Sequence, residues 1–101
     1  MKRVFVLALV SAMISVIVGC GPALYTVHIT PAARAVEQAR EADAARHAPY
    51  EFYYAEAHLR KAREEASEAS YQEAIRFAGI AEEYGDKARD LARRRLREMG
   101  R

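Results

Sequence analysis

The stretch that decides the fold runs from residue 49 to residue 92 and reads PYEFYYAEAHLRKAREEASEASYQEAIRFAGIAEEYGDKARDLA. Small apolar residues recur in it at alternating intervals of three and four, the spacing of a heptad seam. If the chain reverses near Ser70, facing residues should have numbers that add to about 140. Five pairs of seam positions satisfy this relation, Ala66 with Ala74, Ala62 with Ala78, Leu59 with Ala81, Ala55 with Gly85 and Phe52 with Ala88, which predicts an antiparallel hairpin of two Ala-rich helices. The full seams are Phe52, Ala55, Leu59, Ala62, Ala66 and Ala69 before the turn, and Ala74, Ala78, Ala81, Gly85, Ala88 and Ala92 after it.

Three helical segments are expected, over residues 31–47, 49–69 and 71–99. Thr30 and Pro31 have the residue types of a helix start, a cap followed by a proline in the first turn. Pro49 disfavours helical geometry at the residue before it, so a helix must end or kink there. Ser70 and Glu73 have the spacing of a capping box, which predicts the start of the last helix.

The first segment has a seam of its own, at Ala32, Ala35, Ala39 and Ala42. Two arrangements remain open: it folds back as a third helix, or it continues the second segment through a kink at Pro49. The spacing from Ala42 to Phe52 breaks the heptad, which favours a change of direction. The fold class is therefore all-α, an Ala-rich coiled-coil hairpin or a three-helix version of it.

The beginning of the chain is typical of a secretory signal peptide. A basic start is followed by an apolar run from residue 4 to 18, shorter than the ~20 residues that a membrane span needs. The run ends in Ile17-Val18-Gly19-Cys20, which resembles the bacterial lipobox. That resemblance implies cleavage before Cys20 and attachment of acyl chains such as palmitate to it. Residues 1–19 are then the signal peptide, and residues 20–30, with the β-branched and aromatic stretch LYTVHI, an extended tether.

Removal of residues 1–19 leaves 14 basic and 14 acidic side chains, so the mature chain has no net charge. The single cysteine allows no disulfide framework, so stability must come from helix packing. An exported chain of this kind is not expected to bind nucleic acid, despite its many arginines. Gly21 follows Cys20 in place of an aspartate retention signal, which favours the outer membrane, facing the periplasm, over the inner one.

The run from His47 to Ala92 resembles family 4398 of the domains of unknown function, bacterial lipoproteins with an Ala-rich helical pair behind a lipobox. The stretches APYE, LRKAREEA and YQEAIRFAGIAEEY carry this resemblance. The last also resembles the second helix of a tetratricopeptide repeat, but it does not recur along the chain. The resemblance implies an envelope location and, in some members, association with OmpA-like proteins that bind peptidoglycan. It brings no catalytic residue.

No constellation of residues suggests catalysis, a metal or a cofactor. The three histidines, His28, His47 and His58, are spaced unlike metal ligands. The adjacent carboxylates Glu64-Glu65 and Glu82-Glu83 point about 100° apart on a helix. Glu64, Glu65 and Glu83 have i,i+4 cations as predicted partners, in Arg60, Lys61 and Lys87, so a solvated helix face is expected. The chain is therefore not expected to be an enzyme.

Two groups of side chains are candidates for binding a partner. Tyr50, Tyr53 and Tyr54 either pack against the first segment or form an exposed aromatic patch. The basic end, with Arg93, Arg94, Arg95 and Arg97, exceeds the one turn of cations that a helix C-terminus favours. Either these arginines only complement the C-terminal end of the helix, or they contact an anionic envelope surface, namely lipid head groups, peptidoglycan carboxylates or an acidic protein.

Together these features predict a lipid-anchored, noncatalytic adaptor or scaffold of the cell envelope. Its expected partners are the membrane, through Cys20, and an envelope protein or a peptidoglycan-associated component. The alternative is a homo-oligomeric structural coiled coil resembling murein lipoprotein, although the chain ends in Met99-Gly100-Arg101 and not in a lysine that peptidoglycan could be joined to.

Overall fold

The structure, a computed structural model, describes residues 1–100, and for residues 13–19 it describes the backbone alone. Within this range the chain forms four helices and no strand: α1 (Lys2–Glu41), α2 (Ala44–His47), α3 (Pro49–Ser67) and α4 (Tyr71–Met99). The predicted all-α class is confirmed.

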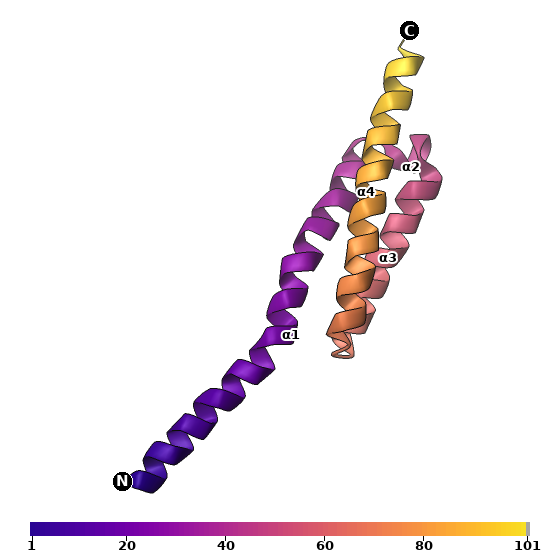
Figure 1. Cartoon of the computed structure of the whole chain (residues 1–101). Coiled ribbons are helices and arrows are strands. Elements are labelled where there is room, and N and C mark those ends of the chain that lie inside the picture. The colour runs from indigo at the N-terminus through magenta and orange to yellow at the C-terminus, as the bar shows by residue number, and fades with distance from the viewer. Residues whose placement is uncertain (101) are drawn as a thin grey trace.

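Helices α3 and α4 form the predicted antiparallel hairpin (Figure 1). The ten seam positions from Phe52 to Ala62 and from Ala74 to Ala92 are all buried, whereas Ala66 is half-buried and Ala69 is exposed. The seam thus opens over the last turn before the chain reverses. The predicted bounds of the two helices agree with the structure to within two residues.

The turn between α3 and α4 is built differently from the predicted capping box. Ser70 does stand at the N-cap of α4, but its side chain makes no capping hydrogen bond. The Glu73 carboxylate is paired instead with Arg76, at 2.8 Å. The chain reverses because Ala69 adopts a left-handed backbone, with φ of 60°, and the Ser70 N–H donates to the Glu65 carbonyl at 2.8 Å.

The first segment folds back as a third helix, one of the two arrangements that the sequence left open. Its seam is buried at Ala32, Ala35 and Ala39 and half-buried at Ala42, and Val36 beside the seam is buried too. Figure 1 shows this part of α1 alongside α4, with α3 on the other flank of α4. Helix α4 therefore lies between the other two long helices, and its small residues pack against both.

The chain changes direction twice between α1 and α3, at Asp43 and at Ala48, and not at Pro49 alone. Helix α1 ends at Glu41, short of the predicted His47, because Asp43 takes the left-handed conformation with φ of 58°. Aspartate tolerates this region better than most residues. The short helix α2 follows, and Ala48 is extended, with φ of −142°, as expected for the residue before a proline.

Residues 21–30 are helical, so the prediction of an extended tether and of a helix start at Thr30 is wrong. The Thr26 and Thr30 hydroxyls donate to the carbonyls four residues earlier, each at 2.9 Å. The Tyr25 ring lies 6.2 Å from that of Tyr71, and Ile29 packs against the core. Burial against the hairpin overrides the weak extended preference of this stretch.

Gly85 of α4 lies directly against the backbone of α1. A Cβ built on it would lie 2.9 Å from the backbone carbonyl carbon of Ala35 and 3.0 Å from the Val36 nitrogen. The sequence placed Gly85 opposite Ala55 of the hairpin. Its nearest neighbours belong instead to α1, and only a residue without a side chain fits this distance.

Candidate interaction surfaces

Cys20, the predicted lipidation site, lies in α1 beside the turn that joins α3 to α4. It is exposed, and the next residue packs tightly: a Cβ on Gly21 would lie 2.7 Å from the Tyr71 ring. A shallow groove of about 340 Å³ surrounds this point. Cys20 therefore marks the turn end of the bundle. The groove is lined by Cys20, Gly21, Leu24, Tyr71, Gln72 and Ile75.

The part of α1 before Cys20 projects away from the bundle (Figure 1). Its apolar side chains are exposed where the structure describes them, from Val4 to Val10. Across the described residues, none of the helices combines the length and the apolar character that crossing a membrane requires.

The three candidate tyrosines divide into two kinds. Tyr54 is half-buried, and its ring centroid lies 4.3 Å from that of Tyr84 and 4.2 Å from that of His58. It thus packs against α4 and not against the first segment. Tyr50 and Tyr53 are 68% and 55% exposed. These two rings are therefore the exposed part of the predicted patch. The sequence did not predict Tyr84 as the neighbour of Tyr54.

The division predicts different effects of removing each ring. Tyr54→Ala should lower the free energy of unfolding by about 1–3 kcal/mol, because it removes ring contacts between two helices. Tyr53→Ala, the matched control, should change it by less than about 0.5 kcal/mol. Urea unfolding followed by circular dichroism measures both. Equal effects would show that Tyr54 does not pack against α4.

The three histidines lie on three different helices. His28 lies in α1, His47 ends α2 with its Nε2 3.5 Å from Asp43, and the His58 Nδ1 lies 2.8 Å from the Tyr54 carbonyl oxygen. Among the described residues, no three histidine, cysteine or carboxylate side chains gather as a metal site.

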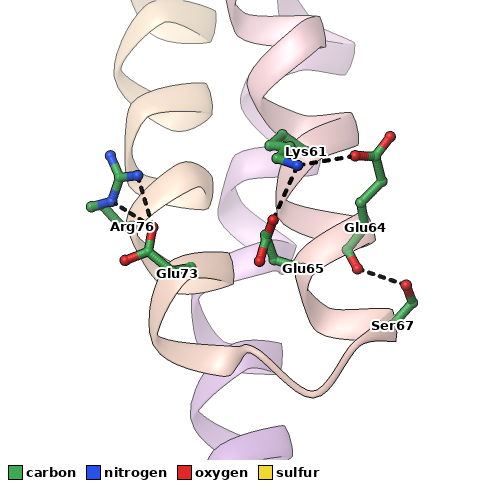
Figure 2. A network of polar contacts seen from close by, with 6 residues as sticks. All are labelled: Lys61, Glu64, Glu65, Ser67, Glu73 and Arg76. Carbon is green, nitrogen blue, oxygen red and sulfur yellow. Dashed lines mark hydrogen bonds and ion pairs between the residues drawn. The ribbon is translucent and has the colours of Figure 1, made fainter.

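The adjacent carboxylates form surface ion pairs with neighbouring cations. Figure 2 shows Lys61 between Glu64, at 3.5 Å, and Glu65, at 3.1 Å. The hydrogen bond that Lys61 donates to Glu65, followed by the charge of Glu65 and by the hydrogen bond to Glu64, raises the pKa of Lys61. Glu83 holds Lys87 at 3.0 Å in the same way. Glu64 pairs with Lys61, whereas the sequence predicted Arg60 as its partner. These carboxylates still lie on a solvated helix face.

The arginine end of α4 extends beyond the rest of the bundle. Figure 1 shows the last turns of α4 running past α2, and every residue from 93 to 100 is exposed. Arg95 turns back toward the bundle, where its guanidinium donates to the His47 carbonyl. The four predicted arginines thus do not act as one group, since Arg95 has a partner within the chain.

A family model matches most of the chain. Residues 28–100 match the model described as Domain of unknown function (DUF4398). Since this covers well over half of the chain, the protein belongs to that family. No curated protein matches the chain. No solved structure matches it either.

Proposed function

We propose that this protein is a lipid-anchored, noncatalytic spacer of the bacterial cell envelope, which holds an adaptor surface away from the membrane. The observation that carries the proposal is the position of Cys20. It lies at the turn end of the bundle, with Gly21 packed on Tyr71. An acyl group on Cys20 would therefore join the membrane to a folded helix without a flexible linker.

Pro22 supports cleavage before Cys20. A proline inside a helix has no N–H to donate and disturbs the preceding turn. The first four N–H groups of a helix have no intrahelical acceptor, so a proline there costs little. Pro22 interrupts the hydrogen bonding of the 40-residue α1, but in a chain that begins at Cys20 it would be the third residue. The sequence of the bundle thus suits a helix that starts at the lipidated cysteine.

Burial within a single chain favours an adaptor over the alternative, an oligomeric coiled coil. In such a coil the apolar seam of one helix is filled by another subunit. Here the alanine seams of α1, α3 and α4 are covered by one another, with exposed fractions of 0–3% at the alanines of the core. A monomer therefore already satisfies the heptad pattern.

Sedimentation equilibrium of residues 20–101 tests this reading. Gly21 packs on Tyr71 of α4, and Ile29 and Ala32 belong to the core, so residues 20–101 contain this packed part of α1 together with α2, α3 and α4. We expect the mass of one chain across the micromolar range. The mass of three chains would favour the structural coiled coil and contradict the spacer.

The proposed place is the outer membrane, facing the periplasm, because Gly21 follows Cys20 in place of an aspartate. The proposed partners are a membrane, through the lipid, and an envelope protein or a peptidoglycan-associated component. Pull-down of the full chain from crosslinked envelopes identifies them, and capture of proteins of the cell interior alone would contradict the location.

A further inference from the structure

Charge pairing divides α4 into two parts at Ala92. Before it the cations have partners: Lys87 pairs with Glu83 at 3.0 Å, and Arg89 pairs with Asp86 at 3.2 Å and Asp90 at 3.0 Å. Arg89 also donates to Gln38 of α1, at 2.7 Å. The cations of this part therefore pair with acidic side chains of α4 and, through Arg89, contact α1.

Beyond Ala92 the charges are unbalanced. Residues 93–100 contain four arginines against Glu98 alone, a balance of +3. Arg95 is held by the His47 carbonyl, whereas Arg93, Arg94 and Arg97 form no hydrogen bond or ion pair with any described residue. Holding several like charges together is unfavourable unless an anion compensates them.

The three unpaired arginines share one face of the helix. At about 100° per residue, Arg97 lies about 40° and Arg94 about 100° around the axis from Arg93. Ala88 and Ala92, which are buried, lie on the opposite side. The three guanidinium groups thus form an outward basic face, and Arg95 is excluded from it.

This basic face is far from Cys20. Arg97 follows Tyr71, the neighbour of Gly21, by 26 residues of continuous helix, or roughly 39 Å. This distance is several times the ~8 Å over which exposed charges act at physiological ionic strength. A protein anchored at Cys20 and standing on its turn end would therefore hold the face away from the head groups of its own membrane.

A groove adjoins the basic face on the side of α3. It has a volume of about 330 Å³, and acidic and basic side chains line it together with the apolar Leu91. Tyr50, exposed next to the groove residue Glu51, stacks on Tyr54 with ring centroids 5.9 Å apart. An extended chain could follow such a groove to the arginines. The groove is lined by Glu51, Lys87, Asp90, Leu91 and Arg94.

From these observations we infer that Arg93, Arg94 and Arg97 bind the peptide carboxylates of peptidoglycan. The inference rests on the proposed anchoring at Cys20. If the protein is anchored there, the distance places the basic face out of reach of the lipid head groups, and a polymer beyond the membrane is then the favoured ligand. Guanidinium groups pair with carboxylates through two parallel hydrogen bonds, and three on one face can engage neighbouring carboxylates of a repeating polymer.

The test is cosedimentation of the full chain, in nonionic detergent, with purified peptidoglycan sacculi. Arg93→Gln/Arg94→Gln/Arg97→Gln should bind about tenfold more weakly than the wild type, since each exposed ion pair contributes modestly. The matched control is Arg34→Gln/Arg60→Gln/Arg63→Gln, which removes the same charge from three exposed arginines of α1 and α3. The control should bind like the wild type.

Two further arms identify the ligand. Capping the sacculus carboxylates with a neutral amine should reduce wild-type binding to that of the triple variant, and raising the salt should weaken it. Equal binding by the two triple variants, or unchanged binding to capped sacculi, would overturn the inference. Release of the wild type by phosphatidylglycerol micelles would also overturn it, since lipid would then be the better ligand. The anchor plays no part in this assay, so failure here leaves the lipidation of Cys20 to be judged by its own measurement.

Discussion

Gly85→Leu is expected to lower the free energy of unfolding by about 3 kcal/mol, at the upper end of the range for overpacking. The Cβ alone would lie 2.9–3.0 Å from three atoms of Ala35 and Val36, two of which belong to the backbone and cannot rotate away. Gly85→Ala should also destabilise, by less, even though alanine favours helices. Urea unfolding of residues 20–101 measures these changes.

Gly79→Ala is the matched control for this prediction. Gly79 lies in the same helix, and nothing stands within 4 Å of a Cβ built on it. Alanine there should raise the free energy of unfolding by about 0.5–1 kcal/mol through helix propensity alone. If Gly85→Ala stabilised the protein as much as Gly79→Ala, α1 would not approach α4 at this point.

Cys20→Ala is expected to leave the precursor uncleaved and without lipid, because it removes the sulfur to which the lipid would be attached. The wild type should lose residues 1–19 and gain acyl chains, and two or more of these hold a protein firmly on a membrane. The measurement is the intact mass of the protein. Ala23→Ser, an exposed position three residues on, should be processed like the wild type. An unmodified Cys20 in the wild-type mature protein would end the proposal of an anchor.

The heptad pattern predicted the core because small residues at seam spacing have no other arrangement that buries them all. The same pattern could not tell which helix each seam residue meets, so Gly85 was placed against α3 when its neighbours are Ala35 and Val36. An alanine seam presents similar shapes to two partners. Only the packing of α4 between two helices decides between them.

The stretch before Ala32 was the main error in the fold, and its cause is tertiary. Tyr25 and Ile29 look extended in isolation, but their contacts with the hairpin favour a helix. The candidate site shows the same limit at Arg95. Its position in an arginine run suggested a ligand contact, and only the placement of α2 beside α4 showed that the His47 carbonyl is its acceptor.

The pairing of α1 with α4 joins parts of the chain that are made far apart in time. Gln38 and Arg89, which are hydrogen bonded, are 51 residues apart, and α4 leaves the ribosome after α1, α2 and α3. Helix α1 therefore lacks α4, the helix with which it makes most of its contacts, while α2 and α3 are being synthesised, since domains fold only when their contacting segments are available. During that interval the first 19 residues and Cys20 stay accessible to any targeting or processing factor that acts on a nascent chain.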